Sequence, residues 1–160
     1  MRARRMCRFG PLAVLLLVTA CGRESSSPTG PSSSSFLSGI WRGTVTIAVN
    51  PGDPGAPAPT SGPITWMFEV VPQTNLQTFR TTINSQHSWL PVTTTASTGL
   101  TPGNTAPAQI STQGQFDSPR GCRGTFGSVG TANASRIEAD FTGVDCNQAT
   151  FRGSVVLTKD

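Results

Sequence analysis

Side chains that could perform enzyme chemistry are scarce in this sequence. His87 is the single histidine, and the neighbouring Ser85 and Ser88 are too close to it along the chain to indicate a Ser-His-Asp triad. No Gly-x-Ser-x-Gly elbow, phosphate loop, set of paired metal ligands or calcium loop occurs. Glu138 and Asp140 are two residues apart, so they lie on the same face of a strand, and alternating acids of this kind normally face the solvent. The sequence therefore predicts no enzyme, no catalytic residue, no metal and no cofactor.

The first 20 residues have the organisation of a secretory leader. Arginines at positions 2, 4, 5 and 8 precede an apolar core from Leu12 to Val18, and the small residues Thr19 and Ala20 follow. The apolar run of residues 11–20 is half of the roughly 20 residues that a helix needs to cross a bilayer. We therefore expect residues 1–20 to act as a signal peptide and not as a membrane span.

The stretch from Leu15 to Cys21 resembles a bacterial lipobox. The resemblance implies a lipoprotein that begins at Cys21 and carries diacylglycerol on the sulfur of that residue. Gly22 resembles the following residue of lipoproteins sent to the outer membrane, where the host has one. The expected location is the cell envelope, with the lipid as anchor; the alternative is an ordinary secretory signal and a free Cys21 thiol.

Charge and cysteine content agree with that compartment. Without the four leader arginines, the 12 basic residues fall to 8, which equals the 8 acidic residues, so no basic surface for nucleic acid is expected. Leader removal and acylation leave Cys122 and Cys146, which we expect to form a disulfide in an oxidising compartment. The competing metal site would need more ligands than these two cysteines and His87 supply.

The remaining chain divides into a tether and one folded domain. Residues 21–35 hold the lipidated cysteine and a Ser, Pro and Gly-rich segment without an apolar side chain to bury, so we expect a flexible tether. Residues 36–160 are enough for one hydrophobic core. A monomer is expected.

Apolar and polar residues alternate with period two through this domain, which is typical of half-buried strands. Eight strands are predicted, at 41–49, 64–70, 77–83, 88–95, 106–116, 121–129, 135–143 and 150–159. They favour an all-β fold, a single antiparallel up-and-down β-barrel, over a β-sandwich. In such a meander Cys122 and Cys146 fall at one end, with the long connection of residues 50–63, and Trp41 falls at the other.

Gly39-Ile40-Trp41 at the start of the first strand is similar to the Gly-x-Trp of lipocalins and related calycin barrels. In those barrels the tryptophan closes one end beneath a cationic residue that follows the last strand, and Lys159 stands at that place here. The resemblance implies that Gly39, Trp41 and Lys159 close the barrel and that function resides at the opposite mouth. Another small closed β-barrel is the alternative, since the chain lacks tyrosine and with it the second lipocalin motif.

An open mouth would make the barrel interior a pocket with apolar walls. The predicted pocket residues are Trp66, Phe68, Phe79, Ile110, Phe126 and Phe141, with glycines such as Gly124 and Gly153 leaving room beside them. Side chains at the rim could orient a polar head group, and the candidates are His87, Trp89, Arg120, Arg123 and Asp145. The same residues are compatible with a filled interior and solvated rim charges.

These patterns lead to two hypotheses of different classes. The first is a lipid-anchored barrel that binds a small apolar or amphipathic ligand. The second is a protein-interaction module of the envelope, because small periplasmic protease inhibitors with an eight-stranded barrel and one disulfide are similar to this plan. A protruding Pro51–Gly55 loop or an ordered Ser32–Leu37 segment would favour the second hypothesis.

Overall fold

The computed structural model describes residues 35–72, 77–101 and 105–160. The predicted leader, Cys21 and the tether up to residue 34 lie outside the described residues. The described chain is all-β, and a single turn of 3-10 helix, η1 (Cys146–Gln148), precedes the last strand. The strands are β1 (Gly39–Val49), β2 (Thr60–Val70), β3 (Thr78–Gln86), β4 (Pro91–Thr101), β5 (Ala108–Asp117), β6 (Arg123–Ala132), β7 (Arg136–Val144) and β8 (Thr150–Lys159).

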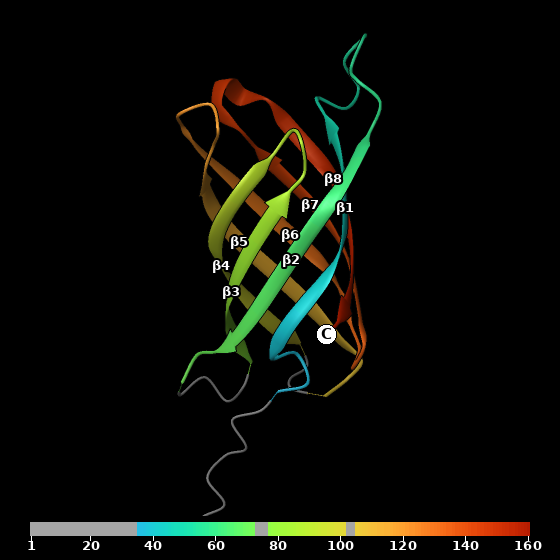
Figure 1. Cartoon of the computed structure of the whole chain (residues 1–160), viewed down its shortest axis with the longest axis vertical. Coiled ribbons are helices and arrows are strands. Elements are labelled where there is room, and N and C mark those ends of the chain that lie inside the picture. Colours follow the sequence, from blue (N-terminus) through green and yellow to red (C-terminus); the bar gives the residue numbers. More distant parts are fainter. Residues whose placement is uncertain (1–34, 73–76, 102–104) are drawn as a thin grey trace, which may run out of the picture.

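The strands form a closed barrel in which each pairs with the next along the chain (Figure 1). All eight pairings are antiparallel, and β1 closes the barrel against β8 in a register that sets Trp41 opposite Lys159. Closure pairs the two edges that an open sheet would expose. The predicted up-and-down barrel is confirmed, and the alternative β-sandwich is wrong.

Alternation along the strands decides which side chains form the core. Val45 and Ile47 of β1, Ile64 of β2 and Ile137 of β7 are buried inside, while their polar neighbours face outward. This is the period-two pattern expected for strands with one face inside a barrel. Every strand thus contributes about every second side chain to the barrel interior.

Most strand boundaries differ from the prediction by one or more residues, and β2 starts four residues earlier and β4 three residues later than predicted. Residues 60–63, predicted as part of a long connection, begin β2 and pair with β1, whereas the pairing of β2 with β3 starts only at Ile64. Pro63 therefore lies where β2 has a neighbour on one side only, a position at which a missing N–H is tolerated. Residues 88–90 were predicted as strand but form a turn, in which the Leu90 amide donates to the His87 carbonyl over 3.1 Å.

The two ends of the barrel differ in how they are covered (Figure 1). We call the end that holds the first described residues and the C-terminus the base. There the Trp41 indole N–H donates to the Leu37 carbonyl over 2.8 Å, and both side chains are fully buried. The Lys159 ammonium lies 5.5 Å from the Trp41 ring centroid and donates to the Phe36 carbonyl over 2.6 Å. Gly39 precedes them with a φ of 114°, a conformation that suits glycine.

The opposite end carries the predicted disulfide, and we call it the disulfide end. Cys122 precedes β6 and Cys146 begins η1, and their Cα atoms are 5.5 Å apart across the bond. The connections at residues 50–59, 87–90, 118–122 and 145–149 all lie at this end (Figure 1). The disulfide therefore joins two neighbouring connections, as the meander predicted.

Candidate functional site

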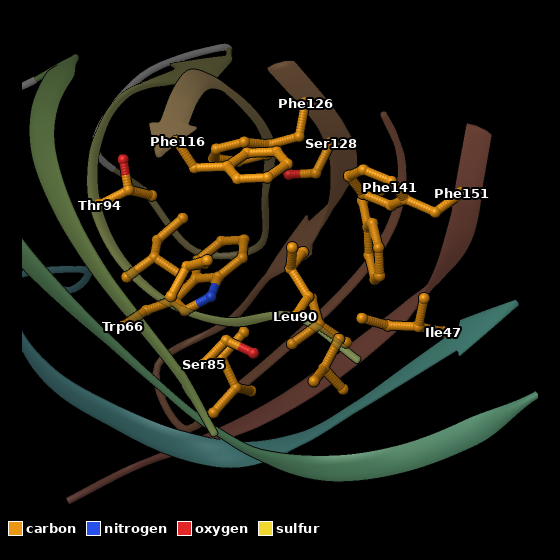
Figure 2. A pocket seen from close by; sticks show the side chains of 15 residues that line it. Ile47, Trp66, Ser85, Leu90, Thr94, Phe116, Phe126, Ser128, Phe141 and Phe151 are labelled. Carbon is orange, nitrogen blue, oxygen red and sulfur yellow. The ribbon is translucent and has the colours of Figure 1, made fainter. Parts of the chain in front are cut away.

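A cavity of about 50 Å³ lies inside the barrel, in the half next to the disulfide end (Figure 2). Its wall is built mainly from hydrocarbon and aromatic side chains, because these are the inward positions of the strands that surround it. The residues that line it are Val45, Ile47, Ile64, Trp66, Ile83, Ser85, Leu90, Val92, Thr94, Phe116, Phe126, Ser128, Phe141, Phe151 and Val155. None of these described side chains carries a charge.

Four phenylalanine rings form one side of this wall. Phe151 lies 6.0 Å, centroid to centroid, from both Phe116 and Phe141, and Phe116 lies 6.5 Å from Phe126. These spacings and tilts are the ones that aromatic pairs prefer. Figure 2 shows the labelled rings side by side along the wall. The wall is thus a connected aromatic surface and not a set of isolated side chains.

Glycines on the neighbouring strands make space for these rings. A Cβ atom on Gly124 would lie 2.2 Å from the Phe116 ring, and one on Gly153 would lie 2.8 Å from the Phe141 ring. The predicted room is therefore occupied by the Phe116 ring beside Gly124, and beside Gly153 by the Thr46 carbonyl, 1.8 Å from the added Cβ, together with the Phe141 ring. This packing explains why a barrel with so many glycines retains only a small cavity.

The predicted pocket residues divide between two levels of the barrel. Trp66, Phe126 and Phe141 line the cavity. The other three predicted residues, Phe68, Phe79 and Ile110, do not line it and are fully buried in the packed half near the base. Phe68 makes edge contacts there with Trp41 at 6.4 Å and with Phe79 at 6.3 Å.

Sequence reasoning missed several residues of the wall, notably Phe116, Phe151 and Leu90. Phe116 and Phe151 occupy inward positions of predicted strands, so the alternation alone could have found them. Leu90 had no such signal, because it belongs to the turn between β3 and β4 and reaches the cavity from the disulfide end. It forms part of the cover of the cavity.

His87, predicted at the rim, lies at the disulfide end but is fully buried. Its Nδ1 accepts a hydrogen bond from the Trp89 amide at 3.1 Å, which leaves the proton on Nε2, and Nε2 donates to the Thr60 carbonyl at 2.9 Å. The backbone of Gly62 packs against it, since a Cβ there would lie 2.7 Å from the His87 Cα. The Nδ1 bond therefore lies within the 87–90 turn, and the Nε2 bond holds that turn against β2.

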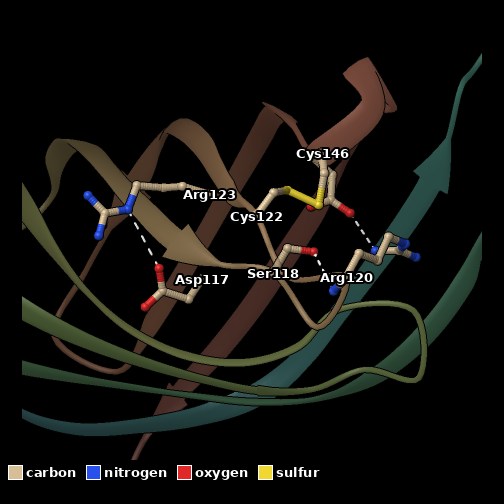
Figure 3. The surroundings of a disulfide bond; sticks show 7 residues. Asp117, Ser118, Arg120, Cys122, Arg123 and Cys146 are labelled. Carbon is tan, nitrogen blue, oxygen red and sulfur yellow. Dashed lines mark hydrogen bonds and ion pairs between the residues drawn. A yellow bond between two sulfur atoms is a disulfide. The ribbon is translucent and has the colours of Figure 1, made fainter.

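Trp89 and Arg120, also predicted at the rim, form a stack over the disulfide end. The Trp89 ring packs 5.4 Å from Phe151, and the Arg120 guanidinium lies 4.6 Å from the Trp89 centroid. Arg120, labelled in Figure 3, also pairs with Asp145, whose side chain is fully buried and whose carboxylate lies within 4.8 Å of both disulfide sulfurs. The stack links the 87–90 turn to the two connections that the disulfide joins.

Arg123, the last predicted rim residue, faces outward. Its guanidinium lies 3.5 Å from the Asp117 carboxylate, and both side chains are largely exposed (Figure 3). Such an exposed pair contributes little to stability. Arg123 is thus not positioned over the cavity.

A metal site at this end is not favoured by the donor set. The atoms of Cys122, Cys146 and Asp145 lie within 4.8 Å of one another. However, both sulfurs are joined in the disulfide, and one Asp145 oxygen is paired with Arg120. A single remaining carboxylate oxygen is too few ligands for a zinc or calcium ion.

Within the described residues, no helix is both long and apolar enough to span a bilayer. Comparison with known proteins gives no relative from which a function could be transferred. No family model matches the chain, and no match was found among curated proteins or among solved structures.

Proposed function

We propose that this protein is a lipid-anchored lipoprotein of the cell envelope whose barrel binds a small apolar or amphipathic ligand. The observation that carries the proposal is the aromatic-walled cavity beneath the disulfide end. Ligand sites are typically concave and lined predominantly by apolar and aromatic side chains, and the wall of this cavity is of that kind. The lipobox resemblance at Cys21 supports the anchor.

The cavity volume limits what the barrel can hold without rearrangement. About 50 Å³ is well below the roughly 150 Å³ that accommodates benzene in a protein core. A larger ligand requires Leu90 to leave the cavity, and Leu90 lies on the 87–90 turn and not on a strand. We infer that this turn is the entry point, because moving it breaks no strand pairing.

A size series of uncharged probes tests the proposal on the full chain. Xenon, cyclopropane and benzene are added in turn, and the methyl resonances of the protein are followed by NMR. Resonances of Ile47, Leu90 and Val155, which line the cavity, should shift with xenon, whereas those of Leu100 and Leu157 in the packed half should not. Equal shifts in both groups would contradict binding in the cavity.

Leu90→Ala extends the series, because removal of one buried leucine can leave a cavity that accepts benzene. This variant should bind benzene with shifts at Ile47 and Val155, while the wild-type protein binds only the smaller probes. Leu100→Ala is the matched control in the packed half, and it should leave the Ile47 and Val155 resonances unmoved by benzene. Failure of every probe in both the wild-type protein and Leu90→Ala would refute the proposed function.

A second candidate function, protein interaction, is favoured by the first connection. Gly52, Asp53, Pro54 and Gly55 are exposed, and the loop stands out beyond the other connections of the disulfide end (Figure 1). Two turns hold its shape, with the Asp53 amide donating to Asn50 and the Ala56 amide donating to Asp53. If chains with residues 51–58 intact and replaced by Gly-Ser capture the same envelope proteins, this loop is not a contact surface.

A further inference from the structure

One carboxylate oxygen beside the disulfide has no hydrogen-bond partner. Three buried polar side-chain atoms of the described residues lack one, namely Trp66 Nε1, Ser128 Oγ and Asp145 Oδ1. Asp145 Oδ1 is the costliest of these to leave unpaired, because it belongs to a carboxylate whose side chain is fully buried. The other oxygen, Oδ2, accepts a hydrogen bond from Arg120. The unpaired oxygen therefore indicates a partner that the disulfide-bonded state does not supply.

This carboxylate and the two cysteine sulfurs form one cluster. The Sγ atoms of Cys122 and Cys146 and a carboxylate oxygen of Asp145 lie within 4.8 Å of one another. Asp145 precedes Cys146 in one connection, whereas Cys122 belongs to another, so the fold of the barrel brings the three together (Figure 3). Thiolates and carboxylates are both zinc ligands, and three protein ligands with a water in the fourth position make a common type of zinc site.

The disulfide withholds two of these three ligands. Reduction by two molecules of a thiol breaks the Cys122–Cys146 bond, gives each cysteine sulfur one electron and one proton, and oxidises the thiol to its own disulfide. Both cysteines are partly exposed, so a small thiol can reach the bond. Binding of a metal ion to the reduced pair then releases the two protons to solvent.

The charge of the reduced cluster matches a divalent cation. Two thiolates and the Asp145 carboxylate carry three negative charges, and Arg120 supplies one positive charge. Arg123 and Asp117, also at the disulfide end, pair with each other and add no net charge. A zinc ion would make the cluster neutral, and Arg120 on Oδ2 would orient the ligating carboxylate.

The positions of the two cysteines are compatible with a shared zinc ion. Two thiolates on a tetrahedral zinc ion, each about 2.3 Å from the metal, are about 3.8 Å apart. The Cα atoms of Cys122 and Cys146 are 5.5 Å apart, which leaves room for that separation by rotation of the side chains. Neither cysteine belongs to a strand, so this rotation requires no change of strand pairing.

We propose that Cys122, Cys146 and Asp145 form a zinc site that the disulfide closes and that reduction by a thiol opens. In the reduced chain the zinc ion replaces the disulfide as the link between the 118–122 and 145–149 connections. None of the three residues lines the apolar cavity, so this inference does not rest on the proposed ligand binding.

Zinc binding is measured on the full chain with Cys7→Ser and Cys21→Ser, so that every thiol comes from Cys122 and Cys146. One sample is reduced with a phosphine, which adds no thiol ligand, and the other keeps the disulfide. Competition with a coloured chelator gives the zinc affinity. Cadmium, added in place of zinc, reports thiolate ligands through its ultraviolet charge-transfer absorption.

The reduced chain should bind one zinc ion and show cadmium–thiolate absorption, whereas the disulfide form should do neither. Asp145→Asn should weaken zinc binding by at least about 10-fold, because even the loss of a group that supports a ligand costs about 10- to 100-fold. Asp117→Asn is the matched control, since it removes an exposed acid from the same end, and it should leave the affinity unchanged. Asp145→Cys offers a third thiolate and should restore tight binding.

Reduction also removes a cross-link, so folding is followed by circular dichroism in the same titrations. If the reduced chain unfolds, zinc should restore its β-sheet signal, because binding to a folded site stabilises the fold. Asp117→Asn should recover at the same zinc concentration, and Asp145→Asn should need at least about 10-fold more.

Equal zinc affinity of the reduced parent chain and of Asp145→Asn would overturn the inference, because the two thiolates alone would then hold the ion. Equally tight binding by the disulfide form would also overturn it. One zinc ion shared between two chains, or no binding by the reduced chain, would contradict a site built within a single barrel.

Discussion

Replacing Gly124 by alanine tests whether the aromatic wall depends on the glycines behind it. The new Cβ would lie 2.2 Å from Phe116 Cζ and 2.7 Å from two further ring carbons. Carbon atoms in good contact are about 3.5–4.0 Å apart, so the ring must move by more than about 1 Å (roughly 3.5 minus 2.2). Phe126 and Phe151 stand 6.5 and 6.0 Å away, centroid to centroid, and limit that movement.

Overpacking of this kind costs about 1–3 kcal/mol. Gly127→Ala is the matched control, because Gly127 lies on the same strand and a Cβ atom added there would meet nothing within 4 Å. Both substitutions remove the same backbone freedom of glycine, which is worth about 0.5–1 kcal/mol in a strand. The difference in unfolding free energy between the two variants should therefore isolate the clash, at about 1–3 kcal/mol.

Urea unfolding of the full chain, followed by circular dichroism, measures this difference, provided that the slopes of the two transitions agree. The cost of Gly124→Ala should also shrink in a Phe116→Leu background, because the smaller side chain relieves the contact. Equal stability of Gly124→Ala and Gly127→Ala would refute the packing argument.

Three further predictions concern the disulfide end and the anchor. Arg120→Met should destabilise the barrel by about 1–3 kcal/mol, because it leaves the buried Asp145 carboxylate unpaired, and adding Asp145→Asn should restore part of the loss in thermal unfolding. Replacing both Cys122 and Cys146 by alanine should lower the unfolding free energy by about 3.5 kcal/mol, since the bond closes a loop with a sequence separation of 24; an unchanged urea midpoint would contradict this. Cys21→Ser should release the protein from the membrane fraction and abolish incorporation of labelled fatty acid, and continued incorporation would disprove lipidation at Cys21.

The sequence by itself determined the strands, their inward faces and the disulfide. Alternation with period two is a local property, so residues such as Ile47 and Ile137 could be placed inside before any pairing was known. The number of strands and the neighbouring connections at Cys122 and Cys146 then followed from a simple up-and-down order.

Only the tertiary structure decided the height of each side chain along the barrel. Strand tilt and register place Trp66 beside the cavity and Phe68, two residues later on the same face, in the packed half. Leu90 and His87 belong to a turn at the site. The path of this turn depends on contacts with β2, which the alternating sequence pattern does not predict. The unpaired state of Trp66 and Ser128 likewise depends on every neighbour in the closed wall, because a hydrogen bond requires two groups to meet and not merely to face the same interior.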